Sequence, residues 1–217
     1  MLILCLDTAG ADCAVLAARD GAVLAQARET LGRGHAERLA PMTQEVLAQA
    51  AAPIASLDRV AVVTGPGSFA GIRVGVAFAR GLALTLGVPA LGFSLFDLLA
   101  RAHGDAPLLA AVHDAARGEI VFRLYRSGAP EGDMQRLALA DAAAAIAGAG
   151  AAPLIAGSAA LLLAPLVPGA RIAEEAGADL GLLARIASDA DPAQFPPSPL
   201  YIRPPDAKLP GGKSLPA

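Results

Sequence analysis

The sequence of 217 residues contains no tryptophan, two tyrosines and six phenylalanines. Aromatic side chains are the usual platforms on which proteins stack the bases of single-stranded nucleic acids. Lysine and arginine number 17 against 20 aspartates and glutamates, which gives a net charge of −3 and no cationic excess to neutralise phosphates. The composition therefore argues against a protein that binds RNA tightly by itself.

Cysteine and histidine are also scarce. Cys5 and Cys13 match no CxxC or Cys/His spacing, so they predict neither a disulfide framework nor a zinc site, and we expect both thiols in the core. The three histidines, His35, His103 and His113, form no HxxxH or HExxH pair. We expect no metal and no other cofactor, because metal ligands would have to come from distant positions.

Targeting and membrane signals are weak. MLILCLDTAG has no basic leader and reaches Asp7 too early for a signal peptide, so the cytoplasm is the expected location. Residues 142–170 carry no charge and are long enough for a membrane span, but glycines and prolines interrupt them. We expect no span there, but a short helix ending near Ala147, a strand over 153–156 and a second short helix from Ser158.

Apolar residues make up 55% of the chain, enough for a large buried core. Three strand-like runs open the sequence, and the second is separated from the third by the turn signal Asp20-Gly21. The helix that follows has an apolar stripe, whereas a later helix over 72–86 is apolar nearly all round and requires cover on most sides. The patterns predict strands over 2–8, 13–19, 22–30, 59–65 and 89–95, and helices over 36–50, 72–86 and 96–103.

The order of strands and helices begins again after Pro107, with a strand, a turn and a strand over 108–128. Such a repetition predicts an α/β protein of two related lobes. The expected division is an N-terminal lobe over 1–103, a smaller and degenerate C-terminal lobe over 104–195, and an extended proline-rich tail over 196–217.

The stretch GPGSFAGIRVG, residues 65–75, joins a predicted strand to the apolar helix. Its glycines miss the GxGxxG spacing, and no Lys-Ser or Lys-Thr pair follows them. One interpretation is a tight turn that lets strand and helix approach closely, with Ser68 capping the helix. The other is an anion site made by free backbone N–H groups at the helix start. Both interpretations involve Gly65, Gly67, Ser68, Gly71 and Arg73.

Asp7 and Thr8 end the first strand, where actin-like ATPases keep a carboxylate for metal and phosphate. The corresponding second hairpin has Asp114 followed by two alanines instead of the glycine that lets phosphate come close, so Asp7, Thr8 and Asp114 suggest a vestigial phosphate site. The alternative for Asp7 is to brace its own hairpin. His113 and Asp114 are neighbours on a strand and point to opposite faces, which argues against a catalytic dyad.

Several stretches occur together in the order typical of bacterial TsaB (YeaZ) proteins: LILCLDTA, RGHAERLAP, GPGSFAGIRVG, the DAARGE hairpin and PLYIRPPDA. The chain resembles this family over nearly its whole length. It departs from the family at Ala70, where threonine is usual, and in the run Asp114-Ala115-Ala116-Arg117, where Asp-Ala-Arg-Arg is usual. The resemblance implies an α/β, actin-like (ASKHA) two-lobed fold, in which each lobe is a mixed sheet flanked by helices.

The resemblance also implies a function. TsaB proteins are non-catalytic partners of TsaD in forming threonylcarbamoyladenosine beside the anticodon of tRNA, and a TsaE-like ATPase and the tRNA are met within that complex. TsaD is a paralogue that binds metal through an HxxxH pair, and the comparable positions here are Leu95 and Leu99. Because leucines cannot bind a metal ion, the resemblance favours a scaffold over an enzyme.

The family's partner surface is built from the helices that correspond to 36–50 and 72–86. Without TsaD, the same surface would pair with a second copy of the chain. The alternatives are an actin-like ATP-dependent phosphotransferase that uses Asp7 and Asp114 around Mg-ATP, and a peptidase, which has less chemical support. The residues expected to bind the partner are His35, Leu39, Met42, Val46, Val74, Gly75, Phe78, Ala79 and Leu82.

Overall fold

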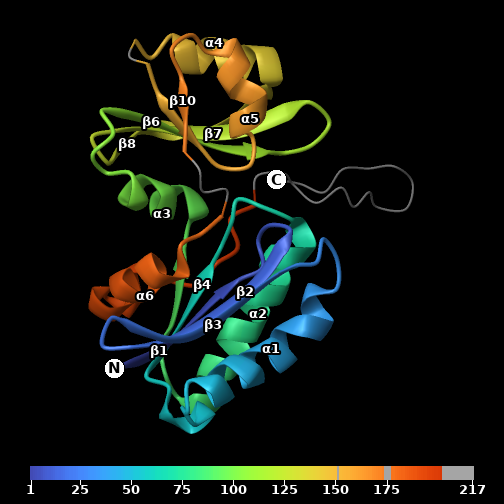
Figure 1. Cartoon of the computed structure of the whole chain (residues 1–217), viewed down its shortest axis with the longest axis vertical. Helices are drawn as coiled ribbons and strands as arrows, with labels where there is room; N and C mark the ends of the chain where they lie inside the picture. Colours follow the sequence, from blue (N-terminus) through green and yellow to red (C-terminus); the bar gives the residue numbers. More distant parts are fainter. Residues whose placement is uncertain (151, 174–176, 202–217) are drawn as a thin grey trace.

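The structure is a computed structural model that describes residues 1–150, 152–173 and 177–201. Within these ranges, ten strands form two five-stranded sheets flanked by helices (Figure 1). The first repeat comprises β1 (Leu2–Asp7), β2 (Asp12–Arg19), β3 (Ala22–Thr30), α1 (His35–Gln49), β4 (Arg59–Val63), α2 (Phe69–Leu86), β5 (Ala90–Phe93) and α3 (Leu95–Ala102). The second comprises β6 (Leu108–Asp114), β7 (Glu119–Arg126), β8 (Ala129–Ala138), α4 (Leu139–Ala147), β9 (Leu154–Ala156), α5 (Ala160–Leu163), β10 (Arg171–Ile172) and α6 (Leu180–Asp189).

The two sheets share one topology. Their strand orders are β3-β2-β1-β4-β5 and β8-β7-β6-β9-β10. In each sheet the central strand is antiparallel to the next strand of its meander and parallel to the strand that follows a helix: β1 pairs with β2 and β4, and β6 pairs with β7 and β9. The predicted fold class is therefore confirmed as the two-lobed α/β fold of actin-like (ASKHA) proteins.

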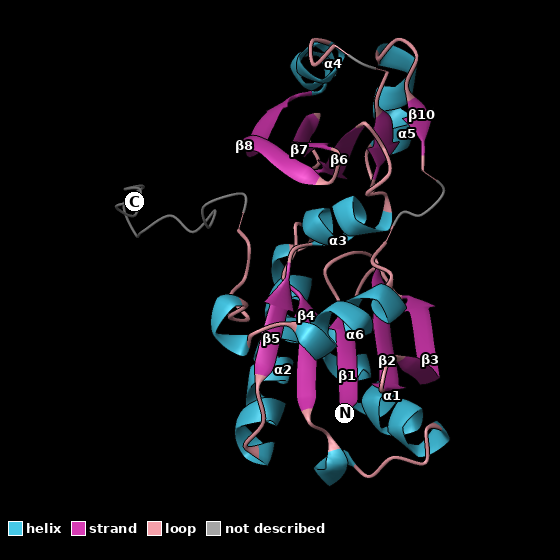
Figure 2. Cartoon of the chain, turned by 90° about the vertical axis from the view of Figure 1, so that its left-hand side faces the viewer, coloured by secondary structure: helices cyan, strands magenta, loops and turns pink. Residues whose placement is uncertain are grey.

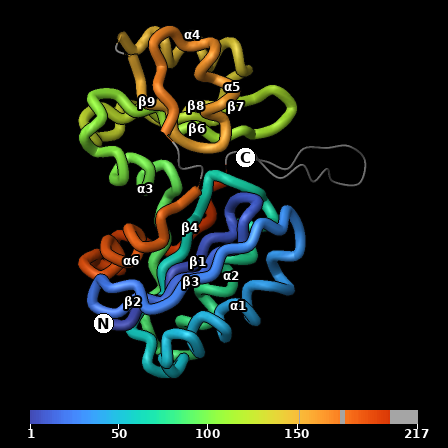
Figure 3. The backbone as a smooth tube through the Cα atoms, in the orientation of Figure 1, coloured from blue at the N-terminus to red at the C-terminus, as the bar shows by residue number. Residues whose placement is uncertain are grey.

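The helices form layers on both sheets. Helices α1 and α2 cover one face of the first sheet and α6 covers the other, while α4 and α5 lie on the second sheet (Figure 2). Helix α3 belongs to the first repeat but packs against β6 of the second sheet, and α6 packs on β1, β2 and β4 of the first. The backbone trace in Figure 3 shows α6 beside the N-terminal strands. The division into lobes at residues 103 and 195 stays a prediction. Helix α6 belongs to the predicted second lobe but contacts the first sheet.

Local sequence explains the main elements of the first sheet. All six residues of β1 are buried, because the strand is central and covered on both faces, so it is a continuous apolar run. Asp20 and Gly21 both have positive φ, 51° and 81°, as the two-residue turn between β2 and β3 requires. Cys5 and Cys13 are buried as predicted, and burial raises the pKa of the Cys13 thiol to about 11.

The uncharged stretch 142–170 holds the end of α4, then β9 and α5, as predicted, with residue 151 outside the described ranges. Among the described helices, α2 is the one long and apolar enough by length and composition to cross a membrane. Core helices of globular proteins meet the same test. One side of α2 packs on the first sheet, yet only 33% of its 18 residues are buried, which leaves apolar surface uncovered.

The residues after α6 run along the edge strand β5. Gly92 N donates to Phe195 O and Leu200 N donates to Thr64 O, both at 2.9 Å, and the Phe93 and Phe195 rings stack with centroids 4.7 Å apart. The described part of the predicted tail is thus an extended strap over the first lobe. Residues 202–217 of that predicted tail lie outside the described residues.

Candidate functional site

The GPGSFAG turn packs directly on the β1–β2 hairpin. A Cβ added at Gly67 would lie 2.1 Å from Ala9 O, and one added at Gly71 would lie 2.1 Å from Thr8 O. Ser68 N donates to Ala9 O at 2.7 Å, and Ser68 Oγ accepts from Gly71 N at 3.3 Å as the N-cap of α2. The glycines therefore permit close approach of backbone to backbone, which confirms the tight-turn interpretation. Anion binding at this turn stays a prediction.

Asp7 and Thr8 are engaged within the first lobe. Asp7 Oδ1 accepts from Ala9 N at 2.9 Å, and Thr8 Oγ1 donates to Gly71 O at 2.7 Å; the two residues are 5% and 0% exposed. Burial raises the pKa of Asp7, and the Ala9 N–H and the charge of Arg28 oppose that rise. Asp7 braces its own hairpin, which is the alternative that the sequence left open for it.

The β6–β7 hairpin repeats this arrangement in the second lobe. Asp114 Oδ1 accepts from Ala116 N at 2.8 Å, as Asp7 does from Ala9. Ala116, Arg117 and Gly118 all have positive φ, 60°, 56° and 76°, so the two non-glycine residues adopt a conformation that usually favours glycine. The hairpin therefore keeps a tight loop, although alanines stand directly after Asp114 where a phosphate-binding hairpin would have glycine. A vestigial phosphate role for Asp114 stays a prediction.

A side-chain pair that the sequence analysis missed lies beside this hairpin. Ser158 Oγ lies 3.0 Å from His113 Nδ1 and accepts from Asp114 N at 3.1 Å. The two side chains come from positions 45 residues apart, so no local motif could reveal them. The side chains of His113 and Asp114 have different partners, as expected for neighbours on a strand.

The predicted partner-binding residues of α1 are core residues. His35, Leu39, Met42 and Val46 are 7%, 1%, 0% and 0% exposed, and α1 lies against β2 and β3. In the free chain these four side chains therefore face their own sheet, and the expectation that they bind a partner stays a prediction. The apolar stripe of α1 covers its own sheet, so the helical period marked the core and gave no information on a second surface.

The predicted residues of α2 fall into two groups. Gly75 and Ala79 are buried, and a Cβ at Gly75 would lie 2.5 Å from Thr8 Oγ1, so these small residues serve the packing of α2 on the sheet and their partner contact stays a prediction. Val74, Phe78 and Leu82 are half-buried and lie on one flank of the helix. Leu84 is 85% exposed on another side of the helix, about 120° round the axis from Phe78 and about 160° from Leu82. We call Val74, Phe78, Leu82 and Leu84 together the outer face of α2.

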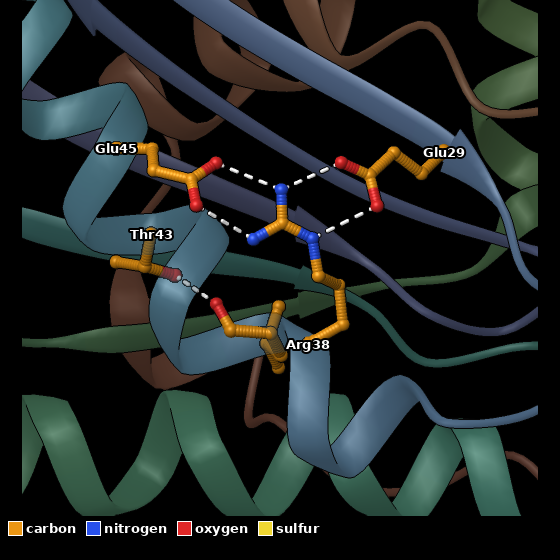
Figure 4. A network of polar contacts seen from close by, with 5 residues as sticks. Glu29, Arg38, Thr43 and Glu45 are labelled. Atoms are coloured by element: carbon orange, nitrogen blue, oxygen red, sulfur yellow. Dashed lines mark hydrogen bonds and ion pairs between the residues drawn. The ribbon is translucent and has the colours of Figure 1, made fainter.

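A charged network holds α1 against β3 (Figure 4). The Arg38 guanidinium lies between two carboxylates: Nε and Nη2 donate to Glu29 at 2.8 and 2.6 Å, and Nη1 and Nη2 donate to Glu45 at 2.8 and 2.7 Å. The hydrogen bonds from Arg38 lower the pKa of both Glu29 and Glu45. The network therefore fixes the position of α1, the neighbour of α2, in the free chain.

The strap reaches the first turn of α2. The Arg73 guanidinium lies 3.7 Å from the centroid of the Phe69 ring, and Arg73 Nε donates to Tyr201 OH at 2.8 Å. Arg73, a residue of the anion interpretation, thus has a partner from the strap. Leu95 and Leu99 are 9% and 3% exposed, and among residues 1–150, 152–173 and 177–201 no group of three or more His, Cys, Asp and Glu could hold a metal ion.

Comparison with known proteins identifies relatives of this chain. A family model described as TsaD, tRNA N6-adenosine threonylcarbamoyltransferase, matches residues 26–160. The tRNA threonylcarbamoyladenosine biosynthesis protein TsaB of Escherichia coli is 37% identical over 130 residues, which cover 58% of this chain and only 55% of that protein. The uncharacterized protein Mb3455c of Mycobacterium bovis is 35% identical over 212 residues, 95% of this chain and 93% of that protein.

A solved structure is also similar. The crystal structure of an uncharacterized Pseudomonas aeruginosa protein with similarity to peptidase YEAZ superimposes with a TM-score of 0.73 at 26% identity, covering 93% of this chain and 99% of that one. A second structure, YeaZ from Pseudomonas aeruginosa, has a TM-score of 0.69 at 24% identity over the same shares. The second likeness is one of fold alone.

Proposed function

The chain belongs to the TsaB (YeaZ) family, and from this premise we propose that it is the non-catalytic subunit that binds a TsaD paralogue during threonylcarbamoylation of tRNA. Through that partner it meets a TsaE-like ATPase, and it meets tRNA only within the complex, in the cytoplasm. In the absence of the TsaD paralogue, a second copy of the chain covers the same surface.

The observation that carries this proposal is the outer face of α2. Val74, Phe78 and Leu82 are only half-buried and Leu84 is 85% exposed, and only 33% of the residues of α2 are buried. Apolar surface of this kind is typical of a face that packs against another protein.

The family model supports a TsaD-like chain as the occupant. The model described as TsaD matches residues 26–160 of this chain, a range that includes both α1 and α2. A TsaD paralogue therefore carries helices equivalent to α1 and α2, and two equivalent helix pairs can pack face to face about a local two-fold axis.

The proposal that the chain takes no catalytic part in threonylcarbamoyl transfer is supported by where Asp7, Thr8, Leu95 and Leu99 lie. Thr8 Oγ1 is bonded to Gly71 O, and the Asp7 carboxylate is buried on its own hairpin. Leu95 and Leu99 stand where the resemblance aligns the metal pair of TsaD. The phosphotransferase alternative is weakened, because the Asp7 carboxylate it would use is only 5% exposed and accepts from Ala9 N through Oδ1.

Light scattering after size exclusion tests the proposal, with the chain alone and mixed with the TsaD paralogue from the same cell. We expect a one-to-one complex with the wild-type chain. Leu84→Asp and Phe78→Asp should each weaken it by at least about 30-fold, as charges placed in an interface core do. Leu161→Asp is the matched control, because Leu161 is 77% exposed on α5 in the other lobe.

Leu84 makes the test decisive, since its exposure means that a charge there does not disturb the fold. If Leu84→Asp and Phe78→Asp both bind the TsaD paralogue as well as Leu161→Asp does, the outer face of α2 is not the partner surface. If the wild-type chain forms no complex, the proposed function itself is wrong.

A further inference from the structure

The topology of the second sheet brings His113 and Ser158 together. His113 is the penultimate residue of β6, and Ser158 follows β9 after a single residue, Gly157. Because β6 and β9 are parallel neighbours, their carboxyl ends meet at one edge of the sheet. A Cβ at Gly157, where φ is 113°, would lie 2.1 Å from Val112 O, so the glycine allows the turn to carry Ser158 against the end of β6.

The hydrogen bonds of Ser158 determine the direction in which its hydroxyl proton points. The Oγ atom accepts from Asp114 N at 3.1 Å and lies 3.0 Å from His113 Nδ1. With one lone pair of Oγ occupied by the Asp114 N–H, the hydroxyl proton is free to point at Nδ1, which accepts it when the imidazole carries its own proton on Nε2. Burial lowers the pKa of His113, against a smaller opposing effect of the Asp114 charge, which favours the neutral imidazole.

This arrangement has the two parts that an activated nucleophile requires. A hydroxyl lies within hydrogen-bonding distance of a neutral imidazole nitrogen, and Ser158 is exposed to solvent, so a substrate can reach it. The Asp114 carboxylate is bonded to Ala116 N, so Asp114 contributes its backbone N–H to the pair and not its side chain. Ser68, the serine of the GPGSFAG turn, has no such base and caps α2.

We propose that Ser158 and His113 form a nucleophile–base pair that accepts acyl groups from small activated esters. Ser158 Oγ attacks the carbonyl carbon while its proton passes to His113 Nδ1, which gives a tetrahedral oxyanion. The oxyanion re-forms the carbonyl as the bond to the leaving oxygen breaks, and the proton on Nδ1 passes to that oxygen. Water then attacks the acyl-Ser158 ester by the same steps, so acid and alcohol are released and the pair is restored. This proposal does not rest on the proposed function.

The experiment uses the full chain and p-nitrophenyl acetate, followed by p-nitrophenolate release and intact mass. We expect one acetyl group on Ser158 of the wild-type chain. Ser158→Ala should lose it, and His113→Asn, which keeps a polar group near the Nδ1 position but no base, should slow acylation by about 100-fold or more. Ser56→Ala is the matched control, because Ser56 is also exposed but its hydroxyl donates to Pro53 O.

Each result decides the proposal. Acylation at Ser158 that depends on His113 and is unchanged in Ser56→Ala supports it. Equal acylation of wild type and Ser158→Ala, or of wild type and His113→Asn, overturns it, since Ser158 would then only link β9 to the β6–β7 hairpin. Thermal unfolding of each variant establishes that the protein compared is folded.

Discussion

Thr8 and Gly71 hold the first strand and the second helix together in two ways. The Thr8 hydroxyl donates to Gly71 O at 2.7 Å, and a Cβ at Gly71 would lie 2.1 Å from Thr8 O. The hydrogen bond requires a short distance that only a residue without a side chain allows. The most specific motif of the sequence is therefore, in its central glycine, a packing contact between α2 and the end of β1.

Two glycine substitutions on α2 should have opposite effects. Gly71→Ala forces a methyl group into Thr8 O, and we expect it to destabilise the fold by about 3 kcal/mol or more. Gly81→Ala is the matched control: a Cβ there meets nothing within 4 Å, so the better helix propensity of alanine should stabilise by about 0.5–1 kcal/mol. Urea unfolding measures both. Equal stability of Gly71→Ala and wild type would contradict the close contact.

Asp7→Asn should stabilise the protein near neutral pH. Burial raises the pKa of Asp7 in the folded chain above its unfolded value, so keeping the carboxylate charged costs stability at higher pH and costs none below the unfolded pKa. Asparagine keeps the acceptor for Ala9 N without the charge. The gain in melting temperature should therefore shrink as pH falls towards about 4. A gain that is independent of pH would show that desolvation of the carboxylate is not its cause.

Most of the fold was predictable from the sequence, because its signals are local. The β1 run, the Asp20-Gly21 turn and the interrupted stretch 142–170 gave the expected elements, and the repeated order gave the two lobes. Strand β8 was missed because none of its ten residues is buried, and Pro130 and Gly132 interrupt any alternation. Helix α6 was also missed, although Asp179 at its N-cap and the apolar spacing of Leu180 and Leu183 were readable signals.

The site was less predictable, because the same apolar spacing serves two purposes. The spacing of Leu39 and Val46 predicts an apolar stripe on a helix, but such a stripe packs equally well on the protein's own core or on a partner. The apolar residues on nearly every side of α2 were the more useful signal, because one sheet can cover only one side of a helix. The pair of His113 and Ser158 depends on the β6–β9 neighbourhood, which becomes visible only with the topology.

The strap should stabilise the first lobe through Phe195. Phe195→Ala removes the stack on Phe93, and we expect a loss of about 1–2 kcal/mol with faster hydrogen exchange at the Gly92 amide, which donates to Phe195 O. Tyr201→Phe keeps the ring on Phe69 and loses only the bond to Arg73, so it should cost at most about 1 kcal/mol. A slower or unchanged exchange at Gly92 in Phe195→Ala would argue against the strap as the cover of β5.

Arg38→Gln should weaken α1 in a way that depends on pH and salt. Arg38 lowers the pKa of Glu29 and Glu45, so the network contributes above their unfolded pKa values and is lost on acidification. The variant should melt at a lower temperature near neutral pH, with the difference from wild type reduced in acid and at high salt. Arg126→Gln is the control, because Arg126 pairs with Glu131 where both side chains are 46% exposed. Equal melting temperatures for Arg38→Gln and wild type at low salt would remove any stabilising role of the network.

Helix α3 packs on the second sheet and α6 on the first, so each helix lies on the sheet of the other repeat. This arrangement matters during synthesis of the chain. The strands of the first sheet leave the ribosome early, but the face on which Leu183 and Ala184 pack stays bare until residues 180–189 have been synthesised. A nascent chain that stops before α6 therefore presents the apolar side of β1 and β4 to water and to other chains. Residues 104–179, which include the strands of the second sheet, are therefore synthesised before the first lobe can be completed.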